Sequence, residues 1–502
     1  MRPGKNFRNT TRTFSEMGSN QSVLKNKGYT IVSEQDNKIL VKNEGGDQFV
    51  IKKLRAEQDH VLNFLKQLSH PHIVHHKEVI KDCDSLHLVM ELCEGGDLAQ
   101  KIEGKVQFSE TEIMDWTVKI CMTLKHLHDQ QILHKNLQPK SIYFTACGTI
   151  RLGEFGKINQ WSTDAQTAKT KSVSYTAPEK LGGKLDDEKS EIWSLGCIIY
   201  EMCMLERAFN GRNTFDIHNC YYEALPFTFS EDLRQLVDDM IKKDPAWRPS
   251  VSEILIRPFI IKHLHQMSTQ TIEELYGRLE VLDELANNLE KVHYNTTVGS
   301  LAGGVVGLAG GITSIVGLIL TPFTLGASLI VTGVGIGVAV AGGVASGASN
   351  ITKMVNQRSN RQNIKLLITE IKEKIASTSC CIQNIHIAVE TQRLLSENSE
   401  AQVASIGRTA AQTARVMRVA EAASGILAGL FAAVDIFFIV LDSREIHRLR
   451  QDYASANNKE QELQSEIMKF VKKIRETREE LKESLDELQV QLQTLEPDIP
   501  NE

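Results

Sequence analysis

One run of this chain contains no Lys, Arg, Asp or Glu, and it constrains the fold more than any other feature. It extends from Val292 to Thr352 and consists of two apolar halves joined by the short turn TPFT. Each half is about 22 to 25 residues long, enough to cross a hydrocarbon core of about 30 Å. Pro322 lies in the turn, so we expect a helical hairpin with both ends on one side. The alternative is a buried hairpin, rich in Gly and Ala, in the core of a soluble helical bundle.

Glycines recur in this run at intervals of four residues, which places them on one face of each helix. Such stripes of small residues let helices pack closely in lipid, where no hydrophobic force drives them together. We therefore expect contact with membrane lipids along the hairpin. The residues at these positions are Gly299, Gly303, Gly307, Gly311, Gly333 and Gly337.

A third apolar run, from Ser424 to Leu441, has the carboxylate Asp435 within it. A carboxylate at the centre of a bilayer costs about 2.5–3.5 kcal/mol on insertion scales. We therefore expect this run to insert more easily once Asp435 is protonated. The alternative is a bundle helix in which Asp435 is paired or exposed.

The C-terminal segment, residues 446–502, carries apolar residues at alternating three- and four-residue steps. This spacing predicts an amphipathic helix with a heptad-like seam and one stutter. Such a helix can fold back on its own domain or associate with a second copy, so self-association through it or through the hairpin remains open. The seam consists of Leu463, Ile467, Phe470, Ile474, Thr477, Leu481, Leu485, Leu488, Leu492 and Leu495.

Residues 270–445 resemble the apolipoprotein L family. The match extends from Ile272 to Asp442 and includes VHYNTTVGSLAGGVVGLAGG and DIFFIVLDS. The resemblance implies an all-α region that binds lipid and associates with membranes, and some members of that family form channels. Because the first residues lack the apolar core of a signal peptide, we expect an intracellular, membrane-associated protein. A secreted lipid-transport apolipoprotein is the alternative.

Residues 29–265 resemble a protein kinase domain of the NIMA-related type, and residues 1–28 before them are expected to be disordered. The motifs FVIKKL, LSHPHIV, LVMELCEGGDL, YTAPEKL and KKDPAWRPS occur in the order of that family. Several motifs in order identify the fold far better than any one alone. The fold class we expect is therefore an α+β bilobal kinase domain followed by an all-α region with a hydrophobic hairpin and a coiled-coil-like C-terminal helix.

The kinase resemblance also implies roles for individual residues. Lys52 would anchor ATP, and Glu179 would pair with Arg248, while His134 would have a packing role. The hinge would supply further nucleotide contacts, with Met90 as gatekeeper. The hinge candidates are Met90, Glu91, Cys93 and Asp97.

The reacting positions of the catalytic loop HKNLQPKS depart from the family pattern. Asn136 replaces the catalytic aspartate, and an amide cannot accept the substrate proton as a base. Gln138 replaces the lysine that stabilises the transferring phosphoryl group, and Ser141 replaces an asparagine that binds the second metal ion. Three positions of catalytic importance are therefore changed within one loop.

Other parts of the phosphate site are changed as well. The segment from Tyr29 to Val41 contains no glycine, so backbone amides cannot approach phosphates closely. Val61 stands where a glutamate partner of Lys52 is expected, with Glu57 one turn away as a substitute. Glu154 replaces a metal-binding aspartate, and its extra methylene misplaces an octahedral Mg²⁺. We expect Glu154 either to bind a metal weakly or, preferably, to face solvent.

These departures predict a pseudokinase domain that requires no cofactor, although its hinge leaves room for weak ATP or Mg²⁺ binding. The alternative is an active serine/threonine kinase that uses Lys52 and Glu154 in an unorthodox mechanism. We expect the domain to bind a protein partner or to regulate the hairpin. The net charge of −6 shows that the chain is not basic overall, which argues against nucleic acid as its main partner.

Overall fold

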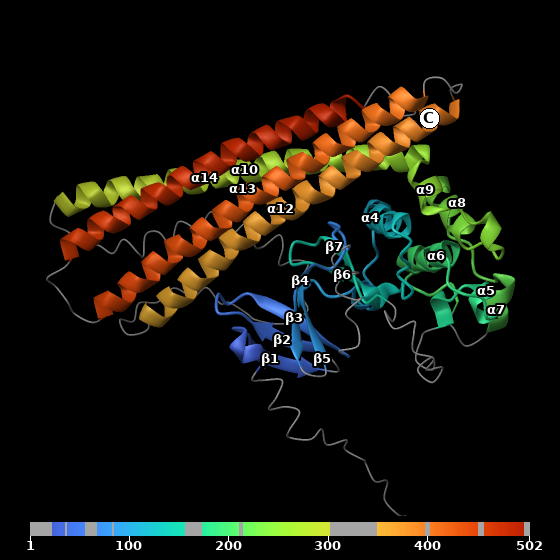
Figure 1. Cartoon of the computed structure of the whole chain (residues 1–502), viewed down its shortest axis with the longest axis horizontal. Coiled ribbons are helices and arrows are strands. Elements are labelled where there is room, and N and C mark those ends of the chain that lie inside the picture. The colour runs from blue at the N-terminus through green and yellow to red at the C-terminus, as the bar shows by residue number, and fades with distance from the viewer. Residues whose placement is uncertain are drawn as a thin grey trace, which may run out of the picture.

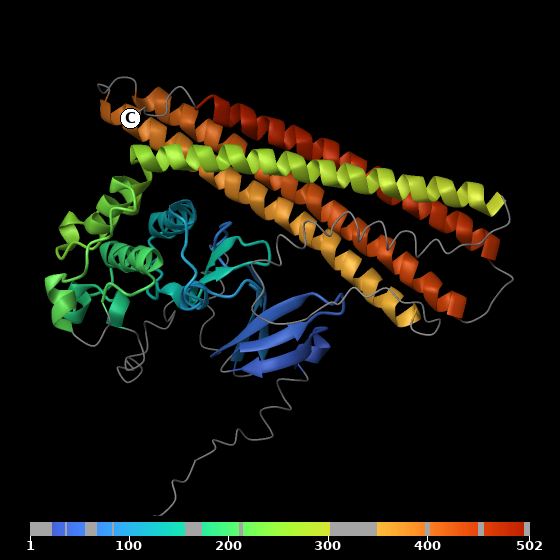
Figure 2. The same cartoon turned by 180° about the vertical axis from the view of Figure 1, so that it is seen from behind.

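The computed structural model describes residues 23–35, 38–55, 68–82, 85–155, 173–209, 214–301, 349–396, 402–449 and 456–495. A bilobal α+β domain lies on one side of a layer of long helices, as Figures 1 and 2 show from opposite directions. The positions Gly303, Gly307, Gly311, Pro322, Gly333 and Gly337 lie outside the described residues, whereas Gly299 belongs to the last turns of a long helix.

The N-terminal lobe contains a five-stranded antiparallel sheet in the order β1-β2-β3-β5-β4. Apolar residues such as Ile39, Val41 and Ile51 alternate along β2 and β3 and are buried together. This alternation places one apolar face of the sheet in a small core. The strands are β1 (Thr30–Gln35), β2 (Lys38–Lys42), β3 (Gln48–Arg55), β4 (His76–Asp82) and β5 (Ser85–Glu91).

The described part of the N-terminal lobe includes residues 23–28, which precede β1. Residues 23–26 form a helical turn, and Leu24 is completely buried in the small core beside Tyr29. The amide of Tyr29 donates to the carbonyl of Leu24, which closes the turn. The apolar pair Val23–Leu24 is too short to show a period, so its burial depends on the sheet it covers.

The C-terminal lobe is helical around a central helix, α6, that is buried on nearly every side. Asp187 caps α6 and, with Ser190, forms a capping box that fixes its first turn. Trp193 and Leu195 of this helix are fully buried. The elements of the lobe are α3 (Leu98–Glu103), α4 (Glu110–Asp129), β6 (Ile142–Phe144), β7 (Ile150–Leu152), α5 (Pro178–Leu181), α6 (Glu188–Met204), α7 (Thr214–Asn219), α8 (Glu231–Met240) and α9 (Val251–Leu255), with short 3₁₀ turns η1 (Pro139–Ser141), η3 (Val173–Tyr175) and η4 (Pro245–Trp247).

In the described residues after 257, four long helices are present: α10 (Pro258–Leu301), α12 (Ser349–Ser396), α13 (Gln402–Leu449) and α14 (Ala456–Gln493). They lie side by side across the kinase-like domain in both views (Figures 1 and 2). Helix α10 starts in the C-terminal lobe and passes through residues 265–270 without a break. A continuous helix, with no flexible linker at this junction, therefore joins the two parts.

Helix α14 packs against α10 and α13 of its own chain. The seam residues from Ile467 to Leu495 are buried, with exposures of 5 % or less. Phe470 stacks on Phe437 of α13 with ring centroids 4.5 Å apart. In this structure the seam is thus satisfied by folding back, one of the two alternatives that its periodicity left open.

The buried seam of α14 predicts different effects for two substitutions that lie close together. Leu488→Ala removes a fully buried side chain and is expected to lower the free energy of unfolding by about 2–5 kcal/mol. Val490→Ala, at a position 52 % exposed on the same helix, is expected to change it by no more than about 0.5 kcal/mol. Urea melts followed by circular dichroism measure both.

The same melts separate the two packing modes of α14. A helix folded back on its own chain gives a Tm that is independent of protein concentration. A Tm that rises with concentration would show that a second copy supplies the partner of the seam.

Candidate active site between the two lobes

The catalytic loop is held by buried polar groups of the C-terminal lobe. His134 is completely buried, and its Nε2 lies 2.8 Å from the carbonyl oxygen of Gly153. Glu191 of α6 accepts a hydrogen bond of 2.6 Å from the amide of Lys135 and contacts His128 at 2.8 Å. Burial lowers the pKa of His134, so the ring is neutral and serves to position the loop.

A buried ion pair joins two other segments of the C-terminal lobe. The guanidinium of Arg248 donates to both carboxylate oxygens of Glu179, at 2.7 and 2.8 Å. It also donates to the carbonyls of Lys242 and Lys243, and its side chain is completely buried. The structure therefore brings together two residues that are far apart in the sequence and uses them as a structural link.

The three substituted positions of the loop bond to one another and to its backbone. The Nδ2 of Asn136 donates to the carbonyl of Glu154 at 2.8 Å, and its Oδ1 accepts from Nε2 of Gln138 at 3.1 Å. The hydroxyl of Ser141 is buried and donates to the carbonyl of Gln138 at 2.8 Å. This network provides neither a carboxylate base nor a cation for a transferring phosphoryl group.

The carboxylate of Glu154 lies between two lysines of the N-terminal sheet. Lys38 of β2 contacts it at 2.7 Å, and Lys52 of β3 contacts it at 3.4 Å. Burial alone would raise the pKa of Glu154, but the two ammonium groups outweigh it and keep the pKa below its ordinary value. Glu154 is therefore ionised and paired, which differs from the expectation that it faces solvent.

Tyr143 fills the space beside this triad. Its hydroxyl donates to Glu154 at 3.2 Å and accepts from Lys38 at 3.3 Å. Burial raises the pKa of Tyr143, and the neighbouring carboxylate raises it further. The phenol therefore stays protonated and adds a neutral, bulky group to the cleft.

The residues present do not fit a Mg²⁺ ion. Both oxygens of Glu154 face ammonium groups, which repel a divalent cation, and Ser141 is turned into the protein. Across the described parts of the chain, no group of three or more His, Cys, Asp or Glu side chains converges as a metal site. Val61 and Glu57, the candidate partners of Lys52, lie outside those parts.

The hinge residues serve the protein itself in this structure. Asp97 is the N-cap of α3 and accepts from the amide of Gln100 at 2.9 Å. Burial raises the pKa of Cys93 to about 12, so it remains a neutral thiol. Met90 is partly buried and packs against the large core. The hinge side chains available to a nucleotide therefore include the carboxylate of Asp97, which already caps α3, and the neutral thiol of Cys93.

Glu91, the last residue of β5, bonds to residues behind the hinge. It accepts from the amide of His75 at 2.7 Å and from Nε of Arg151 at 3.0 Å. Arg151 also donates to Glu373 of α12 at 2.9 Å. The hinge is therefore bonded to the helical bundle as well as to the lobe behind it.

A hollow lies at the catalytic loop. Its lining includes Asn136, Gln138, Tyr175, Lys180 and Glu191, which all belong to the C-terminal lobe.

Several residues of the site were not found from the sequence. Lys38 lies in the segment noted only for its lack of glycine, and none of the motifs quoted above contains Tyr143 or Glu191. Lys38 and Tyr143 lie at the less buried positions of their strands, next to buried apolar residues, so the alternation along β2 and β6 was the available signal.

The other candidate site is the apolar part of α13. Within the residues that the structure describes, one helical segment, Thr409–Leu441, is long and apolar enough to cross a membrane, a property shared by core helices of soluble proteins. Only 33 % of its most apolar window is buried, and Ile436 and Ile439 are each 58 % exposed. Asp435 is paired with Arg361 and Lys365 of α12, at 2.7 and 2.8 Å.

Comparison with known proteins identifies both parts of the chain. The model of the protein kinase domain matches residues 37–260, and that of apolipoprotein L matches residues 228–394. The second match begins inside the C-terminal lobe and ends in α12, whereas the sequence resemblance extended from Ile272 to Asp442.

Curated relatives match the kinase part. Serine/threonine-protein kinase Nek1 of Mus musculus is 36% identical over 255 residues, which are 47% of this chain and 21% of that protein. Nek5 of Homo sapiens is 32% identical over 264 residues, 50% of this chain and 37% of that protein. Nek3 of Mus musculus is 33% identical over 265 residues, 49% of this chain and 51% of that protein. The chain thus spans about half or less of the length of these relatives. It carries a protein kinase domain with Nek-like relatives, followed by an apolipoprotein L family region.

Proposed function

We propose that the kinase domain is a catalytically inactive scaffold and that the apolipoprotein L region binds intracellular membranes. The proposal that the kinase domain is inactive rests mainly on the pairing of Glu154 with Lys38 and Lys52. The groups that would hold metal and phosphate are engaged with one another. Membrane lipids are the proposed ligand, and the kinase domain regulates the helical region or binds a protein partner.

The loss of transfer follows from the chemistry of the loop. Phosphoryl transfer depends on positioned metal ions, a phosphate-anchoring cation and a group that orients the nucleophile. Asn136 supplies an amide that is already bonded on both sides, and Gln138 is neutral. Restoring transfer would require several of these groups to change together.

Membrane binding is supported by apolar surface on α13 and by the charge-free run between α10 and α12. The exposed Ile436 and Ile439 would leave water on contact with lipid, which is favourable by about 25 cal/mol per Å² of apolar surface. Asp435 opposes deep insertion of α13 unless it keeps a cationic partner or is protonated. We therefore propose that the charge-free hairpin inserts first and that α13 follows only when its pairs with Arg361 and Lys365 are broken.

The first prediction for this function concerns phosphoryl transfer. Purified full-length chain incubated with radiolabelled ATP, Mg²⁺ and a general protein substrate is expected to give no more label than Lys52→Met. The reason is that neither a base nor a metal site is formed around Asn136 and Glu154. Label well above that of Lys52→Met would instead support the unorthodox kinase that uses Lys52 and Glu154.

The second prediction concerns lipid. Wild-type chain is expected to float with liposomes, and Gly311→Arg to bind at least about tenfold more weakly, because a central arginine costs about 2.5–3.5 kcal/mol. Gly277→Arg is the matched control, since it adds the same charge at an exposed helical position with open space around it.

Two results would contradict the membrane proposal. Wild-type chain that stays at the bottom of the gradient would remove it altogether. Equal losses in Gly311→Arg and Gly277→Arg would show that binding depends on surface charge and does not involve insertion of the hairpin. Recovery of the chain from culture medium in place of the membrane fraction would favour a lipid-transport role.

A further inference from the structure

Helix α12 contacts two different environments along its length. Its apolar residues Ile364, Leu367, Ile371 and Ile375 are buried in the large core, which continues into the bundle. A second stripe, with Glu373, Ser377 and Cys380 at steps of four and three, faces the kinase domain. Residues at these steps lie on one side of a helix. Between residues 364 and 390 only Lys372 is exposed, so the helix is enclosed from both sides.

Glu373 makes the most polar contact of this stripe. One of its carboxylate oxygens accepts from Arg151 at 2.9 Å, and the other accepts from the hydroxyl of Thr145 at 2.9 Å. Both Arg151 and Glu373 are at least nine-tenths buried. A buried charge that loses its partner is costly, so this pair resists separation.

Arg151 also connects Glu373 to the hinge. Its guanidinium also donates to the carboxylate of Glu91, at the end of β5, and to the carbonyl of Pro71. Glu91 in turn accepts a hydrogen bond from the amide of His75, the residue before β4. One arginine therefore joins α12, the hinge and the segment that precedes β4.

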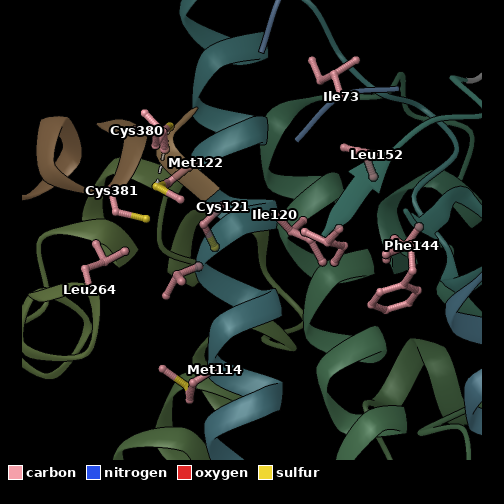
Figure 3. Packing of buried hydrophobic residues seen from close by; sticks show 14 of the residues in the cluster. Ile73, Met114, Ile120, Cys121, Met122, Phe144, Leu152, Leu264, Cys380 and Cys381 are labelled. Atoms are coloured by element: carbon pink, nitrogen blue, oxygen red, sulfur yellow. Dashed lines mark hydrogen bonds between the residues drawn. The ribbon is translucent and has the colours of Figure 1, made fainter. Parts of the chain in front are cut away.

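The next turns of α12 extend the contact to both lobes. Ser377 lies 3.1 Å from Nε2 of His72, and Sγ of Cys380 lies 3.4 Å from Nε2 of His70. Cys380 also contacts Met122 of α4 at 3.9 Å, and Figure 3 shows Cys380 and Cys381 lying against that helix. At the other end of α12, Lys365 lies 3.6 Å from Asp47 in the turn between β2 and β3.

We propose that α12 is an internal clamp on the kinase domain, which fixes the angle between the two lobes through Glu373 and Arg151. A stiff helix that is bonded to the β2–β3 turn, the hinge and α4 allows little rotation of one lobe against the other. Opening of the bundle withdraws α12 from the hinge and releases the lobes. Because coupling between two sites is reciprocal, a ligand that changes the lobe angle also changes the stability of the bundle.

The clamp is tested first without lipid, by hydrogen exchange of the full chain. Glu373→Gln weakens the contact with Arg151 and is expected to speed amide exchange in residues 70–76 and 85–98 by roughly tenfold. Glu370→Gln is the matched control, because Glu370 lies one turn away on the same helix and pairs with Arg278 of α10. The control is expected to speed exchange in α10 and α12 and to leave the hinge unchanged.

Glu373→Asp is a milder variant that keeps the test valid if Glu373→Gln fails to fold. It keeps the buried charge but shortens the side chain by one methylene. It is expected to give an intermediate acceleration at the hinge. Unchanged hinge exchange in both Glu373 variants would overturn the clamp. An equal acceleration at the hinge in Glu370→Gln would also overturn it, because the effect would then reflect general loosening of the bundle.

A further experiment with lipid tests whether the clamp is coupled to membrane binding. This part of the inference rests on the proposed membrane function. Adding liposomes of phosphatidylcholine and phosphatidylserine to the wild-type chain is expected to speed hinge exchange once the chain is bound. Bound chain with unchanged hinge exchange would overturn the link between bundle opening and the hinge. Absence of binding would contradict the membrane function alone, because the lipid-free comparison still decides the clamp.

Discussion

The short segment from Arg151 to Glu154 links the parts of this molecule through charge. Arg151 bonds the back of the hinge to Glu373 of the helical bundle, and Glu154 bonds the front of the cleft to two lysines of the sheet. Only two residues lie between the two charges along the chain. The relative positions of the sheet, the catalytic loop and α12 therefore depend on one strand, β7, and the turn that follows it.

The kinase fold persists here because its packing and its chemistry are carried by different residues. His134 and Glu191 hold the catalytic loop by buried hydrogen bonds, and the pair of Glu179 with Arg248 links other segments of the same lobe. Asn136, Gln138 and Ser141 bond to one another and to nearby backbone. The shape of the loop therefore does not depend on a carboxylate or a cation at these three positions.

The sequence predicted the elements whose signal is local. The heptad-like seam predicted the buried face of α14 because that face repeats at steps of three and four, and ordered motifs predicted the two lobes. The signal was absent where a contact joins distant segments: Lys38 meets Glu154, and Arg151 meets Glu373, through tertiary packing alone. The continuity of α10 across residues 265–270 also lacks a local signal, because the kinase motifs end before this stretch and the amphipathic period begins after it. Asp435 was found from its place in an apolar run, but its partners Arg361 and Lys365 lie on another helix.

The proposed inactivity of the kinase domain depends most on Glu154 being held by lysines instead of a metal ion. Isothermal titration of the full chain with ATP, in Mg²⁺ and then in EDTA, measures this directly. We expect the same weak affinity, or the same absence of binding, in both buffers, because Mg²⁺ finds no ligand set beside Lys38 and Lys52. An affinity that rises tenfold or more with Mg²⁺ would contradict it, since Glu154 would then have released its lysines to bind the metal.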